Sequence, residues 1–232
     1  MSERTRFKLY FAPGTCARVP LIALEEIGEP FDTHVVKFLA GEHRSPEYLS
    51  LNPKGKVPLL LVDGEPLTEN VAIIHWLARE YPGARLLPQA HDSWAQARIL
   101  ADIVWCASGL HPIVTRLRLP QYFCETPDGQ ASVWRLAAAA MEPNFQLIEH
   151  RLAHRPWMLG EWSVVDAYIF WVWFRVTGSG FDGTRYPRYE NHARRMAERP
   201  SVARALERER QADEWLRSQN LAVNFSEVRP HQ

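Results

Sequence analysis

The sequence is poor in cysteine and has no excess of either charge. Among its 232 residues there are only three cysteines. A disulfide framework is therefore not expected, and a reducing compartment, the cytoplasm, is the predicted location. Basic and acidic side chains both number 27, so the formal net charge is zero. Nucleic-acid-binding proteins normally carry a basic excess that neutralises phosphates, so no nucleic-acid partner is expected.

Long apolar runs and metal-binding clusters are also missing. The longest run of large apolar side chains covers residues 168–174, whereas a membrane-spanning helix needs roughly 20 residues. Residues 1–6 carry charges and do not resemble the apolar part of a signal peptide. The nine histidines are scattered and the cysteines lie far apart. We therefore expect neither a membrane partner nor a metal site.

The composition is that of a folded protein, with 46% apolar and 23% charged residues, and it excludes disorder. The first 82 residues alternate between short β-branched or aromatic runs and helical patterns. The predicted strands are 7–11, 31–36, 57–62 and 65–67, and the predicted helices are 17–27, a short one opening at 45, and 70–81. This order predicts an α/β domain at 1–82 with a four-stranded mixed sheet, as in thioredoxin-like folds.

The rest of the chain has helical patterns and no strand signal. Residues 83–91 form the predicted linker, residues 92–220 an all-α domain, and residues 221–232 a poorly ordered tail. The predicted helices cover most of 92–119 and the segments 131–152, 163–176, 189–198 and 202–209. The segment 163–176 is so apolar that we expect it at the centre of this domain.

Four short motifs point to one family. They are the run from Lys8 to Cys16 (KLYFAPGTC), the run from Asn52 to Pro58 (NPKGKVP), the run from Leu67 to Asn70 (LTEN), and the run from Ser163 to Asp166 (SVVD). Together, in this order and spacing, they resemble the glutathione S-transferase family, and the first is most similar to the bacterial beta class. The resemblance covers nearly the whole chain, from Phe7 to about Glu209.

This resemblance implies the thioredoxin-like plus all-helical fold, glutathione as co-substrate without a metal, and a two-fold homodimer. The implied reaction is activation of the glutathione thiolate for attack on a small apolar electrophile. Two alternatives stay open: a glutathione-dependent thiol–disulfide oxidoreductase that uses Cys16, and a binding protein that keeps the fold without turnover.

The first motif carries the candidate catalytic residues. Thr15 and Cys16 lie where a helix begins, and unpaired N–H groups and the helix dipole stabilise a thiolate there. By resemblance, Thr15 matches a hydroxyl donor to the glutathione sulfur, Cys16 matches the beta-class cysteine, and Tyr10 matches the tyrosine donor of other classes. Ala17 stands where the beta class usually has Ser. Packing is the competing interpretation for Cys16 and Tyr10.

The second and third motifs carry the candidate glutathione-binding residues. By resemblance, Pro58 follows a cis peptide bond, and Val57 pairs in a strand-like manner with the cysteinyl part of glutathione. Glu69 would accept the γ-glutamyl ammonium, and Asn70, where Ser is usual, would help to hold its carboxylate at a helix N-terminus. Lys56 is the candidate for the glycyl carboxylate, with Lys37 and His43 as alternatives.

The helical domain contributes weaker candidates. His111 resembles a histidine that beta-class enzymes bring to the active site, although a histidine on a helix is more often structural. Trp105 and Tyr122 are candidates for an apolar pocket that holds the electrophile, and Trp171 is equally suited to the core. The helices 92–118 and 131–152 carry more apolar residues than one face can bury, which also favours a homodimer.

Overall fold

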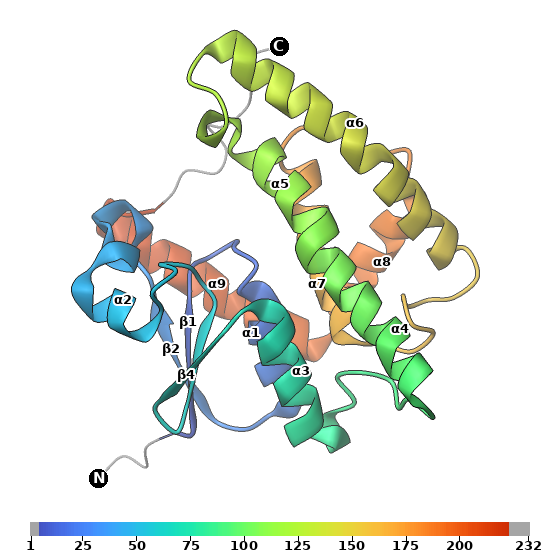
Figure 1. Ribbon diagram of the computed structural model, residues 1–232, viewed down its shortest axis with the longest axis horizontal. Coiled ribbons are helices and arrows are strands. Elements are labelled where there is room, and N and C mark those ends of the chain that lie inside the picture. Colours follow the sequence, from blue (N-terminus) through green and yellow to red (C-terminus); the bar gives the residue numbers. More distant parts are fainter. Residues whose placement is uncertain (1–4, 223–232) are drawn as a thin grey trace. The chain divides into compact units, whose positions relative to one another are not determined.

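The computed structural model describes residues 5–222. These residues form two compact units (Figure 1). Within the described residues, the unit that we call the sheet unit contains residues 5–86 and 198–222, and the helical unit is Leu87–Ala197.

The sheet unit contains the predicted thioredoxin-like arrangement. Its strands are β1 (Phe7–Phe11), β2 (Phe31–Val35), β3 (Leu59–Val62) and β4 (Glu65–Thr68). Their order is β2-β1-β3-β4, with β1 parallel to β2 and the other two pairs antiparallel. The helices are α1 (Arg18–Ile27), the short α2 (Pro46–Leu51), α3 (Asn70–Glu80) and α9 (Pro200–Ser218). The α/β prediction for this half is confirmed.

Alternation along β1 explains how the sheet is covered. Phe7, Leu9 and Phe11 are buried, whereas the residues between them are half-exposed, so one face of the strand packs into the main core. Leu9 pairs with Leu60 of β3, and both are fully buried. Short 3₁₀ turns at Phe38–Ala40, Glu42–Arg44 and Pro82–Ala84 join the elements.

The C-terminal helix α9 belongs to the sheet unit, whereas the predicted all-α domain covered residues 92–220. It also runs from Pro200 to Ser218, whereas the predicted helix covered 202–209. In Figure 1, α9 lies beside α1. The physical reason is electrostatic as well as apolar, because Glu25 and Glu209 form ion pairs with arginines between these two helices.

The helical unit contains α4 (Ser93–Val104), α5 (His111–Arg118), α6 (Pro127–Leu152), α7 (Val164–Thr177) and α8 (Pro187–Glu198). A π-helical segment, Trp105–Leu110, joins α4 to α5, and a 3₁₀ turn, Pro120–Tyr122, follows. α6 begins at Pro127, four residues before the predicted start, because Thr126 caps it by accepting a hydrogen bond from Gly129 N (3.3 Å) and Pro127 suits a first turn.

The predicted central helix and its capping box are both present. α7 is buried along most of its length. Ser163 and Asp166 cap it reciprocally, with Ser163 N donating to Asp166 Oδ2 at 3.0 Å. Asp166 Oδ1 also accepts from Met158 N (2.8 Å) and contacts His192 Nε2 (2.9 Å), and both side chains of the latter pair are fully buried.

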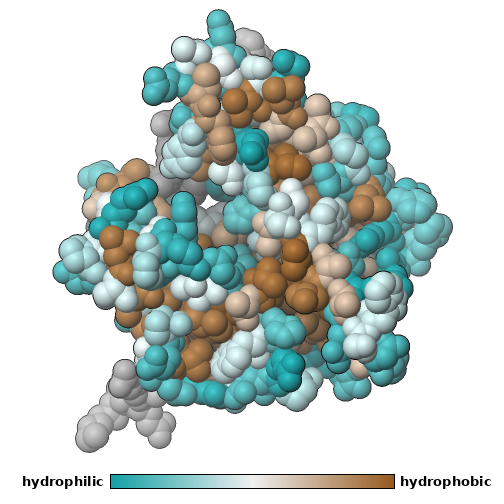
Figure 2. Space-filling view, viewed as in Figure 1, coloured by the Kyte–Doolittle hydropathy of each residue, from teal (hydrophilic) through white to brown (hydrophobic). Residues whose placement is uncertain are grey.

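One helical stretch, Ser93–Arg118, is long and apolar enough to cross a membrane by length and composition alone. This stretch is not an uninterrupted apolar run in the sequence, because charged residues such as Asp102 lie within it. Only 22% of its most apolar window is buried, and Figure 2 shows apolar side chains at the surface over this stretch. Asp102 forms an ion pair with Arg151 of α6 (2.6 Å). The predicted tail, apart from residues 221 and 222, lies outside the described residues.

Candidate functional site

The loop between β1 and α1 holds the candidate catalytic residues in a tight turn. Gly14 has a positive φ of 70°, and Thr15 N donates to Ala12 O at 3.2 Å. Arg18 N and Val19 N then donate to Thr15 O and Cys16 O at 3.1 Å, so α1 opens with 3₁₀-like bonds. Cys16 therefore lies at the amino end of α1, where the helix dipole favours a thiolate.

Thr15 does not direct its hydroxyl hydrogen toward a ligand. Its Oγ1 donates to Ala12 O at 2.7 Å. That proton is used inside the turn, so donation to a glutathione sulfur would require the hydroxyl to rotate away from Ala12 O.

Cys16 brings the first two motifs together. Its Sγ lies 3.8 Å from Val57 O, within hydrogen-bonding range for sulfur. The Val57–Pro58 peptide bond is cis, as the resemblance implied. The ladder of β3 begins at Leu59, so Val57 lies just outside it. The side chain of Cys16 is 8% exposed.

The loop that leads to Val57 is fixed through its main chain. Lys56 O accepts hydrogen bonds from Asn52 Nδ2 (2.6 Å) and from the hydroxyl of Tyr48 (2.7 Å). Gly55 has a φ of +60°, and a Cβ there would lie 2.9 Å from His43 O, so this position requires glycine. These bonds leave the side chain of Lys56 exposed beside a rigid loop.

Glu69 has an unusual backbone for a residue with a side chain, with φ 74° and ψ 123°. Such conformations cost about 1–3 kcal/mol and concentrate at functional sites. Glu69 precedes α3 and makes no side-chain cap of that helix. Its exposed carboxylate instead accepts from Lys54 Nζ at 2.5 Å, and Lys54 also donates to Thr68 Oγ1 (2.8 Å). Lys54 was not among the predicted glutathione-binding residues.

Asn70 joins the third motif to Cys16. Its Nδ2 donates to Cys16 O at 3.0 Å, and the residue is 6% exposed. One N–H donor of this amide is therefore used inside the protein, and its predicted role toward a ligand carboxylate stays a prediction. Its Oδ1 is buried and has no hydrogen-bond partner in the described part of the chain, so the atom left for a ligand is an acceptor.

Tyr10, Lys37 and His43 have other neighbours. Tyr10 packs against the ring of His34 (centroids 4.6 Å apart) and against Tyr48, which gives it a packing role on the sheet. Lys37 Nζ lies over the ring of Trp215 in α9, 5.9 Å from its centroid. Burial and the nearby charges of Arg44 and Lys56 lower the pKa of His43.

A buried ion pair beside Cys16 was not predicted. Arg18 Nη2 donates to Glu209 Oε2 at 2.6 Å, and Arg18 Nε donates to Oε1 at 3.1 Å. Glu209 Oε2 also accepts from Gly14 N at 3.2 Å. A charged pair 191 residues apart in sequence leaves no local signal, because Glu209 lies in a run of alternating charges that resembles a solvated helix face.

In the helical unit, His111 packs into the interior. Its Nδ1 lies 3.3 Å from the hydroxyl of Tyr168, and its ring makes an edge contact with Trp171, with centroids 4.7 Å apart. Trp171 itself is only 2% exposed. These contacts are those of a packed histidine and a core tryptophan.

Trp105 and Tyr122 do not line one pocket. Trp105 Nε1 donates to Asn144 Oδ1 at 3.2 Å and Arg151 lies over its ring, so it is held against α6. Tyr122 is 72% exposed in the turn after α5. About 20 Å of helix separates Trp105 from the end of α5, so the structure does not bring these two aromatics together, and their role toward an electrophile stays a prediction.

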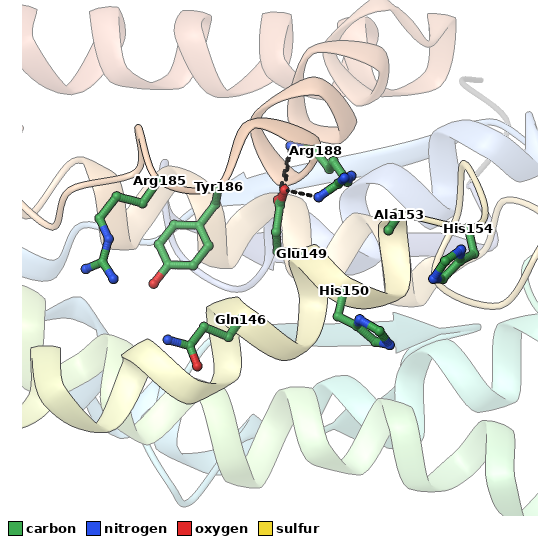
Figure 3. A pocket seen from close by; sticks show the side chains of 8 residues that line it. All are labelled: Gln146, Glu149, His150, Ala153, His154, Arg185, Tyr186 and Arg188. Carbon is green, nitrogen blue, oxygen red and sulfur yellow. Dashed lines mark hydrogen bonds and ion pairs between the residues drawn. The ribbon is translucent and has the colours of Figure 1, made fainter.

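A hollow of about 480 Å³ lies between α6 and the start of α8 (Figure 3). Figure 3 shows Glu149 of α6 pointing toward Arg188. The Glu149 carboxylate accepts from the backbone N–H of Arg188 (3.1 Å) and of Tyr189 (2.9 Å), so it caps α8. The hollow contains none of the predicted site residues.

The described residues contain no group of three or more His, Cys, Asp and Glu side chains that could hold a metal ion. The rings of His150 and His154, four residues apart at the end of α6, do touch, with centroids 5.6 Å apart. The three cysteines are thiols without disulfides. Burial raises the pKa of the Cys106 thiol well above its usual range, and hydrogen bonding to Thr126 lowers that of Cys124.

Known proteins resemble this chain over most of its length. A family model described as the N-terminal domain of glutathione S-transferase matches residues 14–80. A glutathione S-transferase of Escherichia coli O157:H7 is 32% identical over 207 residues, which are 87% of this chain and 98% of the relative.

Two solved structures are similar to this chain in fold. A bacterial beta class glutathione S-transferase of Sphingomonas chungbukensis has a TM-score of 0.76 at 32% identity, covering 87% of this chain and 98% of that one. A sphingomonad glutathione S-transferase complexed with glutathione has a TM-score of 0.76 at 30% identity, with the same coverage.

Proposed function

Because this chain belongs to the glutathione S-transferase family, we propose that its sheet unit binds glutathione around Cys16 and activates the glutathione thiolate. One observation carries the proposal: Cys16 contacts both Val57 (Sγ to O, 3.8 Å) and Asn70 (backbone O to Nδ2, 3.0 Å), so three motifs far apart in sequence meet at one cysteine. The glutathione in the related sphingomonad structure supports the choice of ligand.

Each part of glutathione has a chemically matched group in this proposal. The cysteinyl main chain pairs with Val57, which lies outside the β3 ladder. The γ-glutamyl ammonium meets the Glu69 carboxylate and the buried Asn70 Oδ1. Both of these groups are hydrogen-bond acceptors and suit an ammonium donor. The γ-glutamyl carboxylate meets the N–H groups at the start of α3, and the exposed Lys56 meets the glycyl carboxylate.

The proposed reaction is nucleophilic attack by the glutathione sulfur on a small apolar electrophile. Next to the amino end of α1, the sulfur is held as a thiolate, and its electron pair forms the new C–S bond while the leaving group departs from the electrophile. His111 and Trp105 are packed and Tyr122 is exposed, so the electrophile is defined only by class.

A second candidate is thiol–disulfide exchange, and the Thr15 hydroxyl favours it. That hydroxyl donates to Ala12 O, and the Cys16 thiol lies at the amino end of α1, where a thiolate is favoured. The Cys16 thiolate attacks the glutathione sulfur of a mixed disulfide and releases the other thiolate. A second glutathione thiolate then attacks the Cys16 adduct, which yields glutathione disulfide and restores Cys16.

Paired assays on the wild type, Thr15→Ala and Cys16→Ala test these candidates. Conjugation of a chlorinated aromatic and reduction of a glutathione mixed disulfide are measured for each. A hydroxyl mechanism predicts slow conjugation in Thr15→Ala only, and a cysteine mechanism predicts loss of exchange in Cys16→Ala. If Cys16→Ala leaves both rates unchanged and mass spectrometry finds no glutathione adduct on the wild type, Cys16 is only packing.

We also propose that the protein is a symmetric homodimer in the cytoplasm. Trp94, Leu100 and Val104 of α4 and Leu136 of α6 are large apolar residues exposed by 40–73%, and such patches mark association surfaces. The ion pair of Asp102 with Arg151 suits a protein partner better than a lipid one. The reduced thiols suit a reducing compartment. Light scattering at micromolar concentration that gives a monomer mass would contradict the dimer.

A further inference from the structure

The carboxylate of Glu209 binds both ends of the five-residue segment from Gly14 to Arg18. Its Oε2 accepts from Gly14 N at 3.2 Å and from Arg18 Nη2 at 2.6 Å, and its Oε1 accepts from Arg18 Nε at 3.1 Å. Thr15 and Cys16 lie between these two anchors. A single side chain of α9 therefore spans the turn that carries the candidate catalytic residues.

The ion pair between Arg18 and Glu209 has a fixed geometry. Arg18 is 4% and Glu209 5% exposed, and the guanidinium meets both carboxylate oxygens, which fixes direction as well as distance. Removing one member of such a pair leaves an uncompensated buried charge. The carbonyl side of Cys16 is held separately, by Asn70.

We propose that Glu209 is a positioning residue for Cys16: by tethering Gly14 and Arg18, it holds the thiol against the Val57 carbonyl and limits its exposure. The role of Cys16 toward glutathione rests on the proposed function, whereas the placement of the thiol does not. Glu209 acts through the turn and contacts no reacting atom.

The same pair of helices offers a matched control. Glu25, near the carboxyl end of α1, forms ion pairs with Arg204 (2.6 Å) and Arg208 (2.5 Å) of α9. Its side chain is as buried as that of Glu209, at 7% exposure each. Glu25 therefore joins α1 to α9 through arginine as Glu209 does, but it lies seven residues further along α1 than Arg18 and does not touch the turn.

The experiment compares Glu209→Gln with Glu25→Gln in the full chain. Alkylation of Cys16 by iodoacetamide, followed by peptide mass spectrometry, reports how well the thiol is shielded and needs no glutathione. We expect Glu209→Gln to raise the Cys16 alkylation rate at least fivefold, and Glu25→Gln to leave it within twofold of the wild type. Cys106, which is fully buried, should stay unmodified in all three proteins.

A second readout tests positioning in the reaction itself. In the mixed-disulfide assay, Glu209→Gln should lower kcat at least tenfold while the glutathione affinity from calorimetry changes less than threefold, because Val57, Lys56 and Glu69 are untouched. If the wild type binds no glutathione, the proposed function fails, but the alkylation comparison still decides the role of Glu209.

A double variant covers the case in which Glu209→Gln does not fold. Arg18→Met with Glu209→Met removes both charges together, so no unpaired buried charge remains. We expect the raised alkylation of Cys16 to persist in it, because Gly14 N can no longer donate to Glu209. Wild-type alkylation in the double variant, or equal effects of Glu25→Gln and Glu209→Gln, would overturn the proposal.

Discussion

The two units use their chemically capable residues in opposite ways. In the sheet unit, the groups around Cys16 are tied through main-chain atoms: Ala12 O, Cys16 O, Lys56 O and Val57 O all accept bonds from side chains. In the helical unit, His111 and Trp105 direct their polar atoms to other side chains, Tyr168 and Asn144. A site assembled from loops can thus be recognised from its sequence motifs. The polar residues on these helices, in contrast, form hydrogen bonds within the packed interior.

The largest effect should come from the buried network of the helical unit. Asp166→Ala removes the acceptor for Met158 N, for Ser163 and for His192. We expect the free energy of unfolding to fall by about 3–5 kcal/mol, measured by urea denaturation. The exposed Glu161 is the control, and Glu161→Ala should change the free energy by less than about 0.5 kcal/mol. Equal effects would mean that the network is not what stabilises this unit.

In the sheet unit, the corresponding change should act on binding. Glu69→Ala removes the partner of the γ-glutamyl ammonium, so we expect glutathione binding to weaken by about 1.5–3 kcal/mol, the scale of a charged hydrogen bond. Calorimetry measures this against Glu65→Ala, an exposed acid on β4, which should bind as the wild type does. Unchanged affinity in Glu69→Ala would remove this residue from the site.

His111→Ala tests the contrast from the helical side. A packed histidine that loses its contacts with Tyr168 and Trp171 should cost about 1 kcal/mol of stability and leave conjugation unaffected. Thermal unfolding and the conjugation rate are measured on the same protein. A tenfold loss of conjugation at unchanged stability would show that the helical unit does supply chemistry, and the contrast would fail.

The smallest effect concerns the exposed Lys54. Its ammonium lies where the proposed ligand ammonium would, on Glu69, so Lys54→Met should strengthen glutathione binding. Exposed ion pairs are worth at most about 1 kcal/mol, so the gain in affinity should not exceed about fivefold and should shrink with added salt. Lys8→Met, which removes the same charge from β1, controls for net charge. Weaker binding in Lys54→Met alone would instead make Lys54 a ligand contact.

The sequence predicts what depends on neighbours along the chain. Strand alternation in β1, helical periodicity in α1 and the capping box at Ser163 are local, and each is present. The family motifs assigned Cys16 and Val57 to the same glutathione site, and in the structure the two residues are in contact. The sequence does not show that the Thr15 hydroxyl and the Asn70 amide donate to the main-chain carbonyls Ala12 O and Cys16 O, because the direction of these carbonyls depends on the turn.

Tertiary pairing of charges lies beyond such patterns. Glu209 and Arg18 each resemble solvated residues in the sequence, and only the return of α9 to α1 buries them together. The π-helical segment Trp105–Leu110 was not predicted either. Its irregular turn does not change the apolar spacing enough to be recognised in the sequence.

The return of α9 has a consequence for biosynthesis. Translation at about 5–20 residues per second places Glu209 on the growing chain about 10–40 seconds after Arg18, which precedes it by 191 residues. Throughout that interval the β1–α1 turn has no carboxylate tether, and the Arg18 charge stays in water. The β1–α1 turn therefore reaches its final structure only after α9 has been synthesised. A ribosome that stalls after residue 198 leaves a chain in which Glu209 does not yet position the Cys16 thiol.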